Sequence, residues 1–491
     1  MGWKEVFTRL DDHRFMIPRT YKPGMRTDAV IYADEKMMPQ IFADQAHIQA
    51  ANVACLPGIV GNSLAMPDIH LGYGFPIGGV AAFDPEAGGV VSPGGVGYDI
   101  NCGVRVLRTD LTLDEIKPKI GDIVARLAAN VPSGVGSEGP LSLSSKDLDR
   151  LLVEGAGWAV KHGYGEPNDI AHTEEKGAMA GTDPSLVSAH AKERGTSQQG
   201  TLGSGNHFLE VQTVEEIYDE KVAAVFGLFK GQITIMVHSG SRGLGHQVAT
   251  DYIKVMYEAI RKYDIALPDR QLCCAPIDSP EGERYRAAMA AAANFAWANR
   301  QMLMHWTRES FSQAVGSSPL KLGISLIYDV AHNIAKMEKH KIRDPKSESQ
   351  NMEKILCVHR KGATRAFPAG HPDVPEDYRE VGQPVLIPGD MGRYSYVLVG
   401  TERAMAETWG SVCHGAGRRM SRTSAMRSVS QDDLIKELKA KGIVVMAASK
   451  KGLVEEAPEA YKDVREVVDV VHNAGLAKKV ARMRPLGVVK G

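Results

Sequence analysis

The sequence predicts an α+β fold. Apolar runs typical of buried strands mix with amphipathic helical stretches, without the regular strand–helix alternation of a parallel α/β protein. No internal repeat with a period of about 20–50 residues is evident, which argues against a solenoid or a propeller. The chain has 491 residues and is 43% hydrophobic, so it is long and apolar enough to bury a large core.

The elements follow from composition and periodicity along the chain. The Gly-rich segment from Leu56 to Val104 is predicted as loops and short strands, because apolar anchors such as Ile69 and Phe75 interrupt glycines that allow tight turns. Residues 163–205 are polar and Gly-rich and are predicted as an irregular surface segment. Helices are predicted over Leu111–Val131, Ser145–His162, Thr213–Phe229, Gly245–Tyr263, Ser279–Val315 (one helix or a pair), Gln431–Lys441 and Pro458–Asn473. Strands are predicted at Gln232–Val237, Gly323–Val330, Lys354–His359, Gln383–Ile387 and Tyr394–Val399.

Charge and cysteine usage limit the class of protein without deciding its function. The 58 Lys+Arg and 59 Asp+Glu give a net charge of −1, which neither shows nor excludes a local basic surface for nucleic acid. The charged N-terminus lacks the apolar stretch of a secretory signal, and no uncharged apolar run reaches the ~20 residues that span a bilayer. Six cysteines in so long a chain do not indicate a disulfide framework. We therefore expect a cytoplasmic protein without membrane association.

Five residues combine the side chains and the positions expected of metal ligands. Asp99 and Cys102 stand three residues apart on a glycine-bounded loop, where a carboxylate and a thiolate can converge on one ion. Taken alone, a free cysteine such as Cys102 is more commonly a small buried hydrophobe, and Asp99 alone fits a turn cap. The other three, His207, His238 and His332, each lie beside a Gly-rich turn or at the end of an apolar strand.

One such histidine alone is most simply satisfied by a backbone bond, but the repetition favours a metal site. Five ligands suffice for two ions if one ligand bridges, as a thiolate can. Thiolate and imidazole ligands favour zinc over manganese, although availability and coordination number can override that preference, so ligand type does not decide the metal.

Two Gly-rich turns carry arginine and are candidate phosphate cradles. The first is SGSRGLG (239–245) with Arg242, and the second is HGAGRRMSR (414–422) with Arg418, Arg419 and Arg422. Exposed backbone N–H groups in such turns bind phosphate, and arginine adds a bidentate fork. A lone Gly-rich turn is more simply a tight connection. His414 opens the second cradle.

Motifs in a fixed order carry a family resemblance. GVGYDINCGVR, LGSGNHFLE, VHSGSRGLG, DVAHNIAK, VHRKGATRA and CHGAGR follow one another, and the chain ends in RPLGVVKG. The sequence resembles the RtcB family of RNA-splicing and RNA-repair ligases in these motifs, from about Met66 to the last residue. The resemblance implies that family's own α+β fold, with mixed sheets and helices around a central two-metal pocket. It also implies one catalytic domain over residues 1–491, with 1–65 less covered by the motifs.

The resemblance also implies roles for individual residues. Asp99, Cys102 and His207 would hold one Mn²⁺, and Cys102, His238 and His332 a second, with Cys102 bridging. His414 would be the nucleophile that takes GMP from GTP. Arg242, Arg418 and Arg422 would contact RNA phosphates. The GTP site would comprise Asn206, His207, Phe208, Leu209, Glu210, His332, Asn333, Pro388, Gly389, Asp390, Met391, Ser395, His414, Gly415, Ala416, Gly417 and Lys490.

One position departs from the family pattern. Many relatives carry serine where this chain has Asp390, and an anion there would repel a phosphate unless a metal or Arg393 offsets its charge. The departure bears on the side-chain contact at Asp390 and on nucleotide preference, and it leaves the expected metal ligands and His414 untouched.

The resemblance implies ligation of RNA 3′-phosphate or 2′,3′-cyclic phosphate ends to 5′-hydroxyl ends, through histidine–GMP and an RNA-ppG end, in tRNA splicing or RNA repair. RNA and GTP are then the expected partners, together with an archease-type activator of the kind that relatives often use. Two alternatives stay open: a two-metal phosphoesterase without ligation, and an RNA-end-binding protein without catalysis. The first needs the metal cluster but neither His414 nor Lys490.

Overall fold

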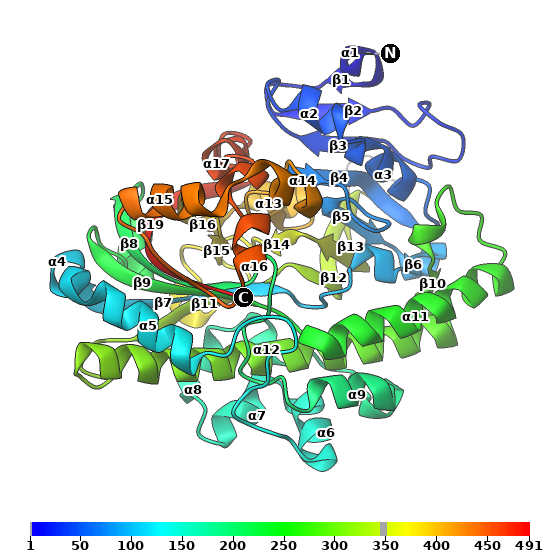
Figure 1. Ribbon diagram of the computed structural model, residues 1–491. Coiled ribbons are helices and arrows are strands. Elements are labelled where there is room, and N and C mark those ends of the chain that lie inside the picture. Colours follow the sequence, from blue (N-terminus) through cyan, green and yellow to red (C-terminus); the bar gives the residue numbers. More distant parts are fainter. Residues whose placement is uncertain (1, 344–350) are drawn as a thin grey trace.

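Two large sheets form the frame of the molecule in the computed structural model, which describes residues 2–343 and 351–491 (Figure 1). The first is seven-stranded, in the order β1 (Thr8–Arg9), β2 (Arg14–Ile17), β3 (Ala29–Tyr32), β4 (Ile59–His70), β5 (Ile77–Phe83), β13 (Asn351–Lys361) and β12 (Asn333–Arg343). The second is eight-stranded, in the order β11 (Ser325–Ala331), β7 (Gly103–Thr112), β9 (Gln232–Ser239), β8 (Phe208–Ile217), β19 (Ala477–Lys490), β16 (Ser395–Gly400) and β15 (Pro384–Ile387), with β18 (Val444–Ala447) beside β19. Neighbouring strands are antiparallel except β3–β4 and β18–β19.

Two small ladders complete the strands. They are β6 (Val90–Val91) with β10 (Ala275–Pro276), and β14 (Ala363–Arg365) with β17 (Ser411–Cys413). The α-helices are α1 (Trp3–Val6), α2 (Met38–Ala43), α3 (Ala46–Val53), α4 (Leu113–Ile116), α5 (Ile120–Asn130), α6 (Ser145–Glu154), α7 (Ala156–Lys161), α8 (Pro167–Ala171), α9 (Ala189–Gly195), α10 (Glu220–Phe226), α11 (Arg242–Lys262), α12 (Pro280–Val315), α13 (Glu402–Thr408), α14 (Arg422–Ser428), α15 (Gln431–Ala440), α16 (Lys450–Glu455) and α17 (Val464–Asn473). This mixture of antiparallel sheets and helices confirms the predicted α+β class.

The long helix α12 supports one side of the second sheet, and α11 runs beside it (Figure 1). The sequence left one helix or a pair open, and the structure shows a single helix of 36 residues. Ser279 caps it by accepting from the Gly282 N–H, Pro280 opens its first turn, and Gly316 ends it with φ +85°. Alanine and methionine bury most of its middle, so α12 serves as a core element. Within the described residues, no helix is both long enough and apolar enough to cross a membrane.

One residue connects a strand of the second sheet directly to a strand of the first. β11 ends at Ala331 in the second sheet, and β12 begins at Asn333 in the first, so His332 stands at the switch. Strand register brings other ends to the same place, because Phe208 pairs with His238 and Gly103 pairs with both Ser239 and Ala331. Loops that leave these strands therefore converge on one point between the sheets.

Most of the predicted elements are confirmed within a few residues. The strand at Gln232–Val237 is β9, extended to Ser239, and the strands at Gly323, Lys354, Gln383 and Tyr394 correspond to β11, β13, β15 and β16. Two predicted helices are each divided in two. Pro118 lies in the short turn between α4 and α5, and Gly155, with φ +57°, separates α6 from α7.

Two predictions were wrong in part. The helix expected over Thr213–Phe229 is only α10, because the residues before it form β8 between β9 and β19, where β-branched Val211, Thr213 and Val214 fit a buried strand. The segment 163–205 is not simply an irregular surface excursion. It contains α8 and α9, and it buries Asp169 against Arg308 and Glu174 against Lys336. The strands β7, β12 and β19 were not anticipated.

The core between β9 and α12 generates a stability prediction. Ile235 is fully buried beside Leu303 and Met304 of α12. We expect Ile235→Ala to lower the free energy of unfolding by about 2–5 kcal/mol, because it removes apolar contacts and leaves a cavity. Urea unfolding followed by circular dichroism measures this, with Ile355→Ala as the control because Ile355 is 60% exposed. Equal losses in the two variants would contradict the assignment of Ile235 to the core.

Candidate active site

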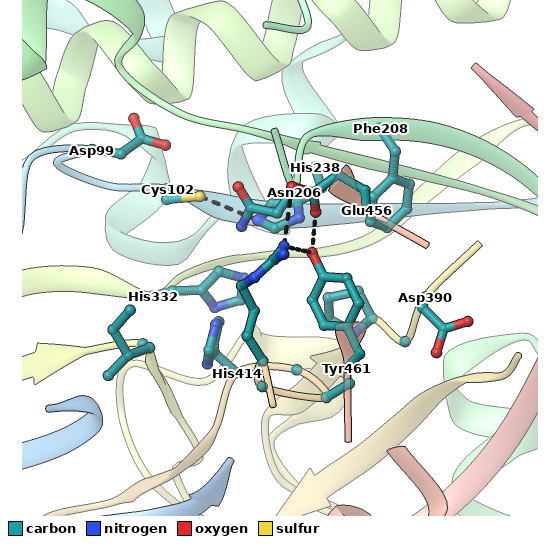
Figure 2. A pocket seen from close by; sticks show the side chains of 18 of the residues that line it. Asp99, Cys102, Asn206, Phe208, His238, His332, Asp390, His414, Glu456 and Tyr461 are labelled. Carbon is teal, nitrogen blue, oxygen red and sulfur yellow. Dashed lines mark hydrogen bonds and ion pairs between the residues drawn. The ribbon is translucent and has the colours of Figure 1, made fainter. Parts of the chain in front are cut away.

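A cavity of about 420 Å³ lies at the junction of the two sheets (Figure 2). It is bounded by the loop before β7, the first residues of β8, the end of β9, the sheet switch at His332 and the turn after β17. All of the predicted metal ligands except His207 line it, and so does His414. The sequence placed these residues on separate strand ends, and the structure brings those ends together.

Three of the five predicted ligands form a tight cluster at one wall of this cavity. One ligand atom each from Cys102, His207 and His238 lies within 4.8 Å of the others. The Cys102 Sγ is 3.1 Å from His238 Nε2 and 3.4 Å from His207 Nε2. The thiol therefore stands between two imidazoles, as a bridging ligand would.

The other two predicted ligands lie next to this cluster, each beside a different histidine. Asp99 Oδ2 is 2.9 Å from His207 Nε2, and the ring centroid of His332 is 5.5 Å from that of His238. His332 Nδ1 bonds to Thr364 Oγ1 at 2.8 Å, whereas its Nε2 is buried and has no hydrogen-bond partner among the described residues. A buried imidazole nitrogen without a partner is costly, and a metal ion would satisfy it. The residues present therefore fit a metal centre.

Burial determines which protonation states the predicted histidine and cysteine ligands adopt. It lowers the pKa of both His238 and His332 well below the usual range, with neighbouring imidazoles adding to the shift. The rings are therefore neutral, as metal ligation requires. Burial and the adjacent Asp99 raise the pKa of the Cys102 thiol, and a bound cation would reverse that effect by stabilising the thiolate.

His414 extends the row of imidazoles beyond the metal ligands. Its ring centroid is 5.3 Å from that of His332, and its Nδ1 is 2.6 Å from the buried Asp68 Oδ2. The same oxygen accepts from the His414 backbone N–H at 2.9 Å. Burial alone would raise the pKa of Asp68, but His414 holds it below its ordinary value, so Asp68 is a carboxylate. With Nδ1 engaged by Asp68, Nε2 is the ring nitrogen of His414 available to a ligand in the cavity.

Most of the residues predicted to bind the nucleotide line the cavity, and three of them do not. Leu209 is buried in the core on the opposite face of β8, so only its backbone is left for a ligand. Ser395 supports the 388–391 loop, since its Oγ bonds to the Gly389 N–H at 3.2 Å. His207 stands among the metal ligands. The cavity is lined by the remaining ones: Asn206, Phe208, Glu210, His332, Asn333, Pro388, Gly389, Asp390, Met391, His414, Gly415, Ala416, Gly417 and Lys490.

One end of the cavity gathers ionisable groups. Pairing of β19 with β8 sets Lys490 beside Phe208, with Nζ 5.6 Å from the ring centroid, and burial lowers the pKa of Lys490. Burial raises the pKa of Glu210 to about 8 and that of Asp390 to about 6. Asp390 also accepts from the Gly392 N–H at 3.0 Å and lies 3.5 Å from the Arg393 guanidinium. The predicted compensation of Asp390 by Arg393 is therefore present.

The three predicted phosphate-binding arginines lie in different settings. Arg242 donates to Thr201 Oγ1 at 2.9 Å, and its backbone has φ +53°. Arg418 lies 3.1 Å from Glu456 Oε1, and Arg422 lies 3.5 Å from the same atom. Glu456 is buried, bonds to the Tyr461 hydroxyl and lines the cavity with both arginines (Figure 2). Sequence reasoning missed Glu456, because no motif or spacing connects it to Arg418 and Arg422.

Comparison with known proteins assigns the chain to a family. The profile of the family described as tRNA-splicing ligase RtcB matches residues 49–491. The chain belongs to the RtcB family. A protein named tRNA-splicing ligase RtcB from Archaeoglobus fulgidus is 57% identical over 491 residues, which cover 100% of both chains. Proteins of the same name from Thermococcus kodakarensis and Aeropyrum pernix are 56% and 55% identical, and the alignments cover at least 98% of each chain.

The predicted metal ligands of this RtcB family member are held in place by one buried arginine that sequence reasoning missed. Arg300 of α12 donates to the Asn101 carbonyl at 2.7 Å, the Asn101 side chain at 3.0 Å and the Ser239 carbonyl at 3.1 Å. Its other donors reach both carboxylate oxygens of Asp329, at 2.7 and 2.8 Å. All five N–H groups of the guanidinium are therefore used. A side chain at Gly103 would come within 2.8 Å of this guanidinium, which explains the glycine there.

We expect Arg300→Lys to weaken binding of a divalent metal ion by about 10–100-fold, because an ammonium cannot hold the segments of Asn101, Ser239 and Asp329 together. Titration calorimetry of the metal-free protein measures this, with circular dichroism to confirm folding. Arg308→Lys is the matched control, since Arg308 lies on the same helix and forms a buried pair with Asp169, away from the ligands. Unchanged metal affinity in Arg300→Lys would show that the ligand loops hold their geometry without it.

Proposed function

We propose that this RNA ligase joins RNA 3′-phosphate or 2′,3′-cyclic phosphate ends to 5′-hydroxyl ends through GMP carried on His414, in tRNA splicing or RNA repair. The observation that carries the proposal is the placement of His414. Its Nδ1 is tied to Asp68, and its ring lies beside His332 at the edge of the metal-ligand cluster. An imidazole held through Nδ1, with Nε2 facing the cavity, is placed as a nucleophile toward phosphorus.

We assign the five ligands to two Mn²⁺ ions that share Cys102. Asp99, Cys102 and His207 would hold one ion, and Cys102, His238 and His332 the other. The 3.1 and 3.4 Å separations of Cys102 Sγ from the two imidazoles support a shared thiolate. When bound, such ions neutralise charge on the phosphate oxygens as the leaving group departs.

The residues of the cavity suit a sequence of phosphoryl transfers. His414 Nε2 would attack the α-phosphorus of GTP, forming a P–N bond while pyrophosphate leaves. The RNA 3′-phosphate would then take the GMP and free the imidazole, giving an RNA-ppG end. Attack by the 5′-hydroxyl forms the phosphodiester and releases GMP. A 2′,3′-cyclic phosphate would first be hydrolysed to the 3′-phosphate. Each step depends chiefly on positioning and charge stabilisation, so one rigid cavity serves them all.

We place GTP against the wall that runs from Asn206 through the 388–391 loop to Lys490. Two carboxyl groups, Glu210 and Asp390, and one amine, Lys490, line this wall and can pair with the edge of a base. The RNA phosphates would lie on Arg242, Arg418 and Arg422. For Arg418 and Arg422, a phosphate would compete with the Glu456 carboxylate that now pairs with both.

The whole chain, residues 1–491, would act as one catalytic domain. Both large sheets contribute to the cavity, through β4 and β12 on one side and β8, β9 and β19 on the other, which supports this assignment. RNA and GTP are the partners that the reaction requires, and an archease-type protein is the activator we expect.

Covalent labelling tests the proposal. Incubation with [α-³²P]GTP and Mn²⁺ should give a label that is acid-labile and hydroxylamine-stable, as expected of a P–N bond to histidine. His414→Ala should abolish the label, whereas His190→Gln, at an exposed position on α9, should keep it. The same incubation with [α-³²P]ATP should label much less.

Other outcomes of the labelling experiment separate the alternatives. Hydrolysis of phosphate esters without any label would favour a two-metal phosphoesterase. Binding of RNA ends without label or turnover would favour an RNA-end-binding protein that lacks catalysis. A label that survives in His414→Ala would place the nucleophile elsewhere.

We expect Asp68→Asn to slow formation of the His414 adduct by on the order of 10³-fold, because the amide cannot hold the ring with its proton on Nδ1. Metal content should not change, since the Asp68 carboxylate bonds to the 414–415 segment and to none of the proposed ligands. Single-turnover labelling and metal analysis on the same sample give both values. Loss of metal with the loss of labelling would assign Asp68 a structural role instead.

A further inference from the structure

A cluster of aromatic rings borders the cavity without any part in the mechanism above. Tyr98 stacks on His246 with ring centroids 4.9 Å apart, and Tyr73 meets Tyr98 edge-on at 5.4 Å. The Tyr73 hydroxyl lies 3.2 Å from the hydroxyl of Tyr257. We call these four residues the aromatic shelf.

The shelf packs against the core on one side, and two of its rings border the cavity on the other. Tyr73 and Tyr98 line the cavity and are half-buried, whereas His246 is exposed. Leu71, two residues before Tyr73, is 54% exposed. Rings that only filled a core would be fully covered, as Phe75 is in the same segment.

The shelf adjoins the metal ligands, at the end of the cavity away from the proposed nucleotide wall. Tyr98 directly precedes Asp99 in the chain. Figure 2 shows Asp99 and Asp390 at opposite sides of the cavity, with His238 and His332 between them. A molecule that reaches the metal ligands over the shelf would therefore not collide with a nucleotide held near Asp390.

The shelf is held rigidly before any ligand arrives. The Tyr73 carbonyl accepts from the buried Lys361 amine, and the next amide, that of Gly74, donates to Gln271 Oε1 at 3.0 Å. A side chain at Gly74 would come within 2.5 Å of the Gln271 carbonyl, so the loop packs closely there. A rigid surface loses little conformational entropy when a ligand binds.

A cation extends the shelf on its outer side. The Arg270 guanidinium carbon lies 5.3 Å from the ring centroid of Tyr257, and Arg270 is exposed. Aromatic rings flanked by an arginine are the arrangement on which single-stranded nucleic acid binds, with bases on the rings and phosphates near the cation.

We propose that the aromatic shelf stacks the terminal, unpaired nucleobase of an RNA strand whose end lies at the metal ligands. The inference rests on the proposed RNA-ligase function and adds a base-binding subsite to it. Every base offers a π face, so the contact accepts any terminal base while requiring that one be present. Both RNA strands, the one with the 3′-phosphate end and the one with the 5′-hydroxyl end, carry a terminal nucleobase. The experiment below determines which of them the shelf binds.

Binding of matched oligonucleotides tests the shelf. One pair of short RNAs ends in a 3′-phosphate and a second pair in a 5′-hydroxyl, and within each pair the terminal nucleotide either carries its base or is abasic. Fluorescence anisotropy should show the wild-type protein with Mn²⁺ binding one base-bearing RNA about tenfold more tightly than its abasic partner. The pair that shows this difference identifies the strand.

Substitutions then connect the difference to the shelf. Tyr98→Leu and Tyr73→Leu should abolish the preference for the base, and Tyr98→Phe should keep it because the ring remains. Tyr218→Leu is the matched control, since Tyr218 stacks on Tyr396 outside the cavity lining. A 2-aminopurine at the RNA terminus should be quenched on binding to wild type and not to the leucine variants.

The outcomes separate this inference from the proposed function. Failure of His414 to take label from GTP would overturn the ligation mechanism. The base-binding role of the shelf would still be tested independently, by the ratio of the affinities for base-bearing and abasic RNA. The shelf would be overturned if the wild-type protein bound the base-bearing and the abasic RNA equally well in both pairs. It would also be overturned if both leucine variants folded and kept the wild-type ratio of these two affinities. Normal His414 labelling in the leucine variants, with the ratio lost, is the result we expect.

Discussion

The Arg300 guanidinium is the contact on which the geometry of the site depends. Burying a lone guanidinium costs several kcal/mol, and here Asp329 and backbone carbonyls offset that cost. The same donors hold three separate segments together: the loop between Asp99 and Cys102, the end of β9 after His238, and β11 before His332. Each of these segments carries a proposed ligand. The hydrogen bonds that satisfy the buried Arg300 guanidinium therefore also fix the distances between the proposed ligands.

The sheet switch at His332 adds a second constraint. The backbone of a residue between two strands of different sheets is fixed in position, because strand pairing holds the residues on both sides of it. The His332 amide donates to the Cys102 carbonyl at 2.7 Å, so the switch is tied directly to another ligand. Figure 2 shows the resulting arrangement, in which His414 stands on the far side of His332 from Cys102. Metal binding and the proposed nucleophile thus share one rigid frame.

The sequence was informative where a local pattern carries the information. The strand before His238 could be predicted from the largely apolar, β-branched run Gln232–Val237, and the family motifs supplied the proposed ligand positions. β8 was partly assigned to a helix, because Thr213–Phe229 has helical periodicity and only pairing with β9 and β19 makes its first residues a strand. Asp68, Arg300 and Glu456 could not be predicted, since each acts through a partner hundreds of residues away or through a fold contact that no spacing reveals. Sequence reasoning therefore proposed the five ligands that the structure brings close together, and it missed the residues that hold them in place.

The departure at Asp390 also looks different once its surroundings are known. From sequence alone, a carboxylate beside a nucleotide predicts repulsion. Burial raises the pKa of Asp390 to about 6, so its charge is less firmly held than on the surface, and the Arg393 guanidinium at 3.5 Å offsets what remains. Glu210, with a pKa of about 8, carries its proton at pH 7 and so adds a hydrogen-bond donor rather than a second anion. The end of the cavity therefore presents one compensated carboxylate, one carboxylic acid and one amine. Such a surface favours a neutral, polar base edge over a phosphate, which is why we place the base rather than the phosphates against Asp390.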